Sequence, residues 1–194
     1  MFSPTEEKSS ALNANYIRHI DHITYVTELE NERSFINHWE TLGFTEHVRL
    51  RCVRYPATHI ALISGTTPEY PWATMTGLSV SEDPKSPVNE FVRRYGAGIQ
   101  HCAYNIHPDA DMEEVHESMK KMGVKFMTPV LTYNDNAGAH LRQMFVPPAR
   151  PFGTFHEYIQ RLPGPDGNAF AGFDTSNIDD LYECYSDVSR ALEK

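Results

Sequence analysis

The chain has 194 residues, of which 40% are hydrophobic, so it can bury the core of one compact domain or of two small modules. Its formal net charge is −9 and Lys and Arg do not cluster, which argues against nucleic acid or an anionic membrane as a partner. No apolar run approaches the roughly 18 residues of a membrane-spanning helix, and the N-terminal residues lack a signal peptide's apolar core. The three widely spaced cysteines favour reduced thiols, so we expect a cytoplasmic protein.

Residues 1–16 are polar and predict a mobile tail, after which two stretches of the chain repeat one plan. In the first stretch a strand at 17–27 contains His22, and a half-buried helix at 30–42 follows and ends at a glycine. Three more strands are predicted at 45–53, 58–64 and 73–80. Residues 17–85 therefore form a first predicted βαβββ module.

The second copy of the plan covers residues 86–162 and opens with a linker helix, because Ser86 followed by proline is typical of a helix start. A strand at 96–106 contains His101, and a helix with a Met-rich apolar side comes after it. Three further strands are predicted at 124–128, 139–146 and 154–161. Residues 163–194 complete the chain with a loop and a last helix that has one apolar face. The pattern indicates an α+β fold.

A carboxylate lies in the middle of the last apolar strand of the second module. Side chains alternate between the two faces of a strand, so Glu157 shares a face with Phe155 and Ile159. A bare carboxylate on such a face is costly unless a cation pairs with it. By the same alternation, His22 and His101 lie on the apolar faces of their own strands.

Two histidines and one carboxylate that face one interior match the facial triad of a non-haem Fe(II) site with open coordination positions. A second interpretation stays open, because a lone histidine on an apolar face is more often a hydrogen-bonded core residue than a ligand. In that case Glu157 would pair with Arg161, which lies on the same face of the strand.

Four segments together resemble the catalytic half of the 4-hydroxyphenylpyruvate dioxygenase family, in the vicinal oxygen chelate superfamily: "IDHITYV", "YGAGIQHCAYNI", "LRQMF" and "FHEYIQR". The resemblance covers roughly residues 17 to 190 and implies paired βαβββ modules that close a cupped mixed sheet around a metal. It also implies that the C-terminal helix forms a lid over the active site. The family enzyme is about twice as long, and its non-catalytic front half has no counterpart here.

Residue by residue, the resemblance implies that His22, His101 and Glu157 bind the metal. It gives Gln143 a catalytic role beside the substrate and the metal. The other substrate-binding positions it implies are Gln143, Phe145, Gln100, Phe173 and Ile178. Alternation, however, turns Gln100 away from the metal.

Three substrate-side positions depart from the family. Its serine falls near His59, its asparagine near Ser81 and a glutamine near Ser86. These departures predict that the metal chemistry is kept while substrate recognition is changed.

The leading hypothesis is an Fe(II)-dependent dioxygenase that uses O₂ and acts on a 2-oxo acid or an aromatic substrate. Zn, Mn, Ni and Co are alternative metals, because the ligand set does not select iron by affinity. Three other functions stay open: a redox-neutral isomerase or lyase, an extradiol-type enzyme, and a non-catalytic protein that binds a small molecule. A homodimer is expected by analogy with short members of the superfamily.

Overall fold

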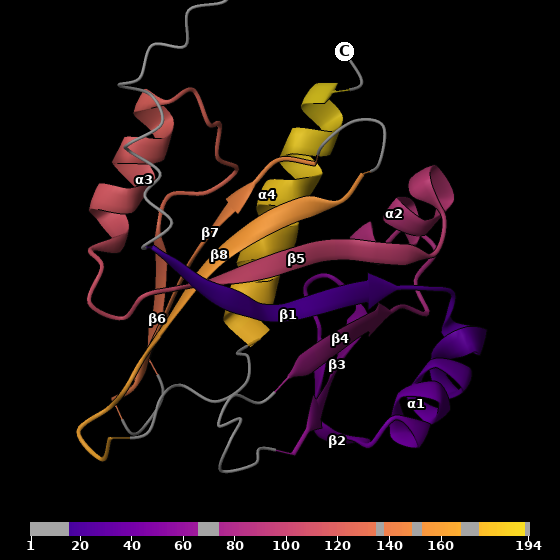
Figure 1. The fold of residues 1–194 in the computed structure, drawn as a ribbon. Coiled ribbons are helices and arrows are strands. Elements are labelled where there is room, and N and C mark those ends of the chain that lie inside the picture. The colour runs from indigo at the N-terminus through magenta and orange to yellow at the C-terminus, as the bar shows by residue number, and fades with distance from the viewer. Residues whose placement is uncertain (1–15, 66–73, 135–137, 149–152, 168–174, 193–194) are drawn as a thin grey trace, which may run out of the picture.

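The computed structural model describes residues 16–65, 74–134, 138–148, 153–167 and 175–192 (Figure 1). The predicted mobile tail therefore lies almost wholly outside the described residues. In the first module the elements are β1 (Ile17–Val26), a 3₁₀ turn (Leu29–Asn31), α1 (Glu32–Thr41), β2 (Phe44–Cys52), β3 (Ala57–Ser64) and β4 (Met75–Val80). The remaining elements are α2 (Pro87–Tyr95), β5 (Gly98–Ile106), α3 (Met112–Lys121), β6 (Leu131–Asn134), β7 (His140–Val146), β8 (Phe155–Leu162) and α4 (Thr175–Leu192).

The strands form one eight-stranded mixed sheet in the order β2-β3-β4-β1-β5-β8-β7-β6. Within each module the first strand pairs in parallel with the last one, β1 with β4 and β5 with β8. The two modules meet where β1 and β5 pair antiparallel. The predicted α+β class with two βαβββ modules is confirmed.

The helices cover different parts of this sheet. Figure 1 shows α1 and α3 at its two ends, while α4 passes behind β1, β5 and β8. α1 packs through Ile36 on a core cluster of β3 and β4, and α3 packs through Met112, Val115 and Met119 on another. None of the described helices is long and apolar enough to cross a membrane.

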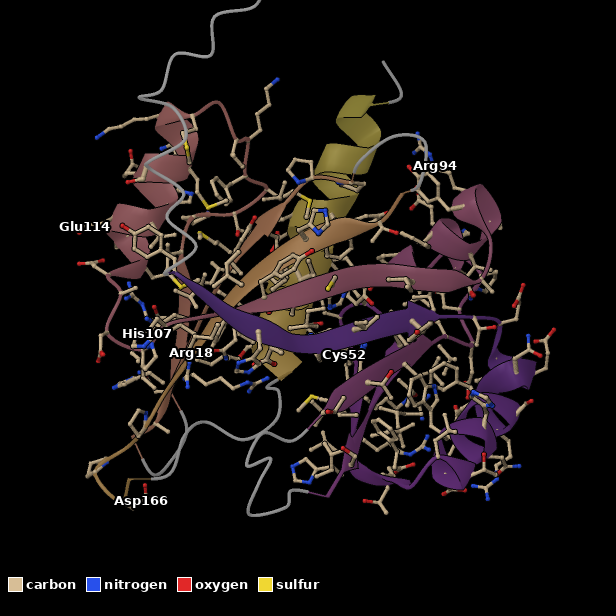
Figure 2. The ribbon with its side chains drawn as sticks, viewed as in Figure 1. Arg18, Cys52, Arg94, His107, Glu114 and Asp166 are labelled. Carbon is tan, nitrogen blue, oxygen red and sulfur yellow. The ribbon has the colours of Figure 1, made fainter. Side chains whose placement is uncertain are left out.

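Figure 2 shows where some polar side chains lie: Arg18 and His107 near the α3 end of the sheet, and Arg94 on α2. α2 begins as predicted, because the Ser86 side chain accepts a hydrogen bond from the backbone N–H of Asn89.

One predicted strand is wrong. Residues 124–128 are not a strand, and β6 instead occupies Leu131–Asn134. Val124 and Phe126 are apolar because they pack on the α3 core cluster. Met127 donates a backbone hydrogen bond to the carbonyl of Phe145 on β7, but Pro129 cannot donate to a strand ladder, and the regular pairing of β6 with β7 begins at Leu131.

Candidate metal centre

The two predicted histidines and the predicted carboxylate come together in the interior. His22 lies on β1, His101 on β5 and Glu157 on β8, three consecutive strands of the sheet. His22, His101 and Glu157 are 1%, 6% and 2% exposed. The register explains their approach, because His22 and Glu157 both lie opposite Ala103, from either side.

The ligand atoms of these residues form a nearly equilateral triangle. Nε2 of His22 lies 3.3 Å from Nε2 of His101 and 3.4 Å from Oε2 of Glu157. Nε2 of His101 lies 3.5 Å from the same carboxylate oxygen. Such spacings suit three atoms that share one divalent ion at about 2.0–2.2 Å each.

The remaining oxygen of the carboxylate supports the same conclusion. Oε1 of Glu157 is buried and has no hydrogen-bond partner among the described residues. A buried carboxylate with an unsatisfied oxygen is costly without a cation. The donor set of two imidazoles and one carboxylate therefore fits a divalent metal, and no other group of three or more such side chains occurs within the described ranges.

Two β-bulges place a second polar side chain beside each histidine. In β1, Ile20 and His22 lie opposite consecutive residues of β5, so Asp21 is the extra residue. In β5, Ile99 and His101 lie opposite consecutive residues of β1, so Gln100 is the extra residue. Simple alternation fails at a bulge, which explains why Gln100 turns inward, against the sequence-based expectation, and why Ile20 on β1 is exposed.

Each bulged residue holds the Nδ1 edge of the histidine that follows it. Nδ1 of His22 lies 3.0 Å from Oδ1 of Asp21, and Nδ1 of His101 lies 3.2 Å from Oε1 of Gln100. A donor Nδ1–H fixes the tautomer in which Nε2 carries the lone pair that a metal needs. Both imidazoles are thus oriented as ligands.

Asp21 is itself held by two further side chains. Arg161 donates from Nη2 to Oδ1 at 2.9 Å and from Nε to Oδ2 at 3.0 Å. Asn105 donates from Nδ2 to Oδ2 at 3.0 Å. The alternative pairing of Glu157 with Arg161 is therefore replaced by an Arg161–Asp21 pair.

Charges around the centre shift its titration. Burial alone would lower the pKa of His22, but hydrogen bonds with Asp21 and Glu157 raise it to about 9. Burial lowers the pKa of His101, and the positive charge of His22 lowers it further. Burial opposes the ionisation of Asp21, yet Arg161 holds the pKa of that carboxyl well below its usual range. Without a metal, His22 is the protonated member of the centre.

A pocket opens beside the centre on the concave side of the sheet. His101 and Glu157 line it together with Gln100, Gln143 and Phe145. The remaining lining residues are Thr24, Val48, Leu50, His59, Ile60, Ala61, Gly77, Leu78, Ser79, Ile178, Leu181 and Tyr182. Ile178, Leu181 and Tyr182 come from α4, so this helix covers the pocket.

The free space in the pocket is about 50 Å³, room for a few water molecules at roughly 10–15 Å³ each.

The structure separates the predicted substrate-side residues. His59 and Ile178 line the pocket with Gln100, Gln143 and Phe145, whereas Phe173 lies outside the described residues. Ser81 lines a different surface depression, and its hydroxyl donates to the carbonyl of Pro56. Ser86 caps α2.

Sequence reasoning missed Asp21, Ser79 and Tyr182 as parts of the site, and it considered Arg161 only as a partner of Glu157. The signal for Asp21 was a charged residue directly before a buried histidine, which alternation assigned to the opposite face.

The modules are not equivalent at the third ligand. Glu157 pairs with the residue two places after His101, and Gly77 pairs with Thr24, two places after His22. Gly77 is therefore the residue of the first module that corresponds to Glu157 in the second module. A Cβ at Gly77 would lie 2.6 Å from Oγ1 of Thr24. The first module therefore contributes no side chain that would correspond to Glu157 as a fourth ligand, and this side of the centre opens into the pocket.

Comparison with known proteins finds similarity in structure. No family model matches the chain, and no curated protein sequence matches it. A variant of 4-hydroxymandelate synthase from Streptomyces coelicolor matches 87% of this chain with a TM-score of 0.68 and 22% identity. This chain spans 53% of the length of that protein.

Two other solved structures extend the comparison. A fusion of a xylose isomerase-like TIM barrel with 4-hydroxyphenylpyruvate dioxygenase matches 89% of this chain at a TM-score of 0.66 and 19% identity, and this chain spans 30% of it. A structure of methylmalonyl-CoA epimerase from Streptomyces coelicolor matches 74% of this chain at a TM-score of 0.55 and 19% identity, and the match covers 97% of the epimerase chain.

The paired βαβββ modules and these matches show that the chain has the fold of these three proteins, which is the fold that the resemblance in the sequence implies. Within that fold, the synthase and the dioxygenase fusion match a larger share of this chain than the epimerase does. Identities of 19–22% establish the fold and leave the activity to the chemistry of the site.

Proposed function

We propose that the protein is a non-haem Fe(II)-dependent dioxygenase that decarboxylates a 2-oxo acid and hydroxylates the remainder of the substrate. The observation that carries this proposal is a buried set of two histidines and one glutamate beside a largely apolar pocket. This ligand set with open positions is typical of non-haem Fe(II) oxygenases. Gly77, in place of a fourth ligand side chain, supports open positions on the pocket side.

Fe(II) held by His22, His101 and Glu157 would supply the redox chemistry for O₂ and a positive charge for the substrate carboxylate. No Lys or Arg is among the described residues that line the pocket. A substrate carboxylate would therefore have no other full positive charge within the pocket to balance it. A substrate acid would therefore bind its carboxylate at the metal and lay its apolar body along the largely apolar wall.

The chain's own residues would position that acid. Gln143 and Phe145 lie on one face of β7, and both side chains line the pocket. The Gln143 amide is 2% exposed and can hydrogen-bond an oxygen of the 2-oxo acid group. Phe145 is buried beside it and offers an apolar surface to the rest of the substrate.

α4 would exclude water during the reaction. Ile178, Leu181 and Tyr182 line the pocket, whose free space of about 50 Å³ is well below the roughly 300 Å³ or more of typical ligand pockets. We expect a substrate to displace α4 side chains on entry, and closure behind it would keep the oxidising chemistry dry.

A redox-neutral isomerase is the second candidate, favoured by the match to almost the whole methylmalonyl-CoA epimerase chain. Such a reaction needs a proton acceptor in the pocket. Apart from the metal ligands, the histidine that lines the described pocket is His59, and burial lowers its pKa to about 3. So weak a base would be a poor proton acceptor, which supports the oxidative reaction over the isomerase reaction.

The deciding experiment measures O₂ uptake and CO₂ release by protein loaded anaerobically with Fe(II). The panel contains phenylpyruvate, 4-hydroxyphenylpyruvate, 4-methyl-2-oxopentanoate and catechol. We expect equal amounts of O₂ consumed and CO₂ released with one 2-oxo acid. His22→Ala and Glu157→Ala should lose the metal and the uptake, while His47→Ala, at an exposed histidine, should keep both.

Two outcomes would contradict the proposal. Uptake with catechol and no CO₂ would indicate ring cleavage. Stoichiometric iron with no uptake for any compound would move the assignment to redox-neutral chemistry or binding. Homodimerisation and a cytoplasmic location stay predictions.

A further inference from the structure

Thr24 is a polar residue of the pocket that the candidate metal centre does not use as a ligand. It lies on β1 two residues after His22 and directly opposite His101 of β5. The residue is 7% exposed and lines the pocket. Directly opposite side chains of an antiparallel pair lie about 4.5–5.5 Å apart at Cβ. The Thr24 side chain is therefore a neighbour of His101, on the face of the sheet that carries His22.

The hydroxyl of Thr24 is directed toward β4. Thr24 pairs with Gly77 of that strand, so the two residues share a face of the sheet. A Cβ at Gly77 would lie 2.6 Å from Oγ1 of Thr24, but 3.3 Å from its Cβ and 3.4 Å from its Cγ2. The hydroxyl therefore occupies the space that the first atom of a side chain at Gly77 would need.

The pseudosymmetry of the two modules gives this space a meaning. In the second module Glu157 lies beside Ala103, which is two residues after His101 and has only a methyl group. In the first module Gly77 lies beside Thr24, which is two residues after its own histidine. Where the second module supplies a carboxylate to the centre, the first module thus supplies a hydroxyl group on the neighbouring strand.

This hydroxyl has no hydrogen-bond partner among the residues that the structure describes. Valine would fill nearly the same volume without a polar atom, and a hydroxyl in a largely buried place is costly when it bonds to nothing. Because Thr24 lines the pocket, its partner can come from the contents of the pocket. A hydroxyl both donates and accepts, so it can bond to an oxygen or a nitrogen atom there.

We propose that the Thr24 hydroxyl binds the exogenous ligand on the open side of the metal centre, where it donates a hydrogen bond to a water molecule or a substrate oxygen that stands in place of a fourth protein ligand. The inference rests on the proposed function for the metal alone, and it holds equally for an oxidative and a redox-neutral reaction. Hydrogen bonds to charged ligands are stronger than those between neutral groups. Loss of the hydroxyl should therefore weaken the binding of a small anion at the centre by about five- to tenfold.

The test measures azide binding to protein loaded with Co(II), followed by visible absorption, so that no turnover is involved. Azide is a small anion that can enter an open coordination position. Thr24→Val removes the hydroxyl and nearly keeps the shape, and we expect its azide affinity to fall by about five- to tenfold. Thr24→Ser keeps the hydroxyl and should bind azide as tightly as the native protein. Thr45→Val is the matched control on β2, because Thr45 is exposed.

A second measurement separates a hydrogen bond from a change of shape. The infrared stretch of bound azide reports the hydrogen bonds that the ion accepts. We expect this band to shift between the native protein and Thr24→Val, and Thr24→Ser should restore the native position. A lower affinity with an unshifted band would assign a steric role to Thr24 and overturn the inference.

The amount of bound Co(II) is measured in every variant. Equal azide affinity of the native protein and metal-loaded Thr24→Val would overturn the inference and leave the proposed function standing. Loss of Co(II) from Thr24→Val would also overturn it, because the hydroxyl would then support the protein ligands. Native protein that holds Co(II) but binds no azide would overturn the inference and contradict the open positions that the proposed function needs. Native protein that holds no Co(II) would overturn both.

Discussion

Asp21 and Gln100 occupy matching positions in the two modules, each at a β-bulge and each bonded to Nδ1 of the histidine that follows it. The two residues differ in charge. Asp21 is a carboxylate fixed by Arg161 and Asn105, whereas Gln100 is a neutral amide. An anionic acceptor makes an imidazole a stronger ligand than a neutral one does. The two halves of the centre are therefore alike in geometry and unequal in electrostatics.

This asymmetry predicts unequal losses of metal affinity. Asp21→Ala should weaken binding of Fe(II) or Co(II) by about 10- to 100-fold, as for other partners of metal-bound histidines. Gln100→Ala should weaken it by less, because a neutral acceptor contributes less to ligand basicity. Competition with a chelator measures both constants. Asp109→Ala removes a carboxylate whose side chain is 89% exposed, and it should leave the affinity unchanged. Equal losses for Asp21→Ala and Gln100→Ala would contradict the asymmetry.

Arg161 should stabilise the fold mainly because it compensates the charge of the buried Asp21. The two side chains are 13% and 6% exposed. Removing one member of a buried ion pair leaves the other charge uncompensated, so Arg161→Met should lower the free energy of unfolding by about 3–5 kcal/mol. Urea unfolding checks the value. The double variant Arg161→Met/Asp21→Asn should recover part of the loss, and a double variant no more stable than the single one would show that the charge is not the cause.

Metal binding should release a proton. The pKa of His22, raised to about 9, lies above the unfolded-state value of 6.5. Protonated His22 therefore stabilises the metal-free protein fully below about pH 6.5, and that stabilisation is lost as pH rises through 9. Because the metal competes with the proton, its affinity should rise by about tenfold per pH unit between these values and level off above pH 9.

Calorimetry in buffers of different ionisation enthalpy counts the protons released at pH 7.5. We expect about one proton per metal ion. Asp21→Asn should reduce the number, since the pKa of His22 depends on this carboxylate. A pH-independent affinity would show that His22 is neutral in the metal-free protein.

Gly153 should tolerate no side chain. Its φ is 71°, and a Cβ would lie 2.4 Å from Cγ of Tyr95 on α2. Gly153→Ala should therefore lower the free energy of unfolding by about 3 kcal/mol or more, from backbone strain and overpacking together. Gly43→Ala is the matched control, because its φ is 88° and no atom lies within 4 Å of its Cβ position. That change should cost about 1–2 kcal/mol, from strain alone. Equal losses of unfolding free energy in the two variants would show that the contact with Tyr95 does not contribute.

The repeat and the candidate metal ligands were accessible from the sequence because they depend on local periodicity. His22, His101 and Glu157 each lie in an apolar strand, and strand alternation places them on the buried face. The position of β6 was not accessible, since Val124 and Phe126 are apolar through packing on α3. The orientation of Gln100 was not accessible either, because a bulge is a property of two paired strands. The same reason hid Asp21 and its pairing with Arg161.

The antiparallel pairing of β1 with β5 bears on how such a centre could have originated. Neither module contains all three ligands, since His22 belongs to the first and His101 and Glu157 to the second. A single ancestral module would have had to associate with a copy of itself to enclose an ion. Duplication and fusion into one chain would free each copy to change independently. The two copies now differ at this position, which carries a carboxylate at Glu157 and no side chain at Gly77.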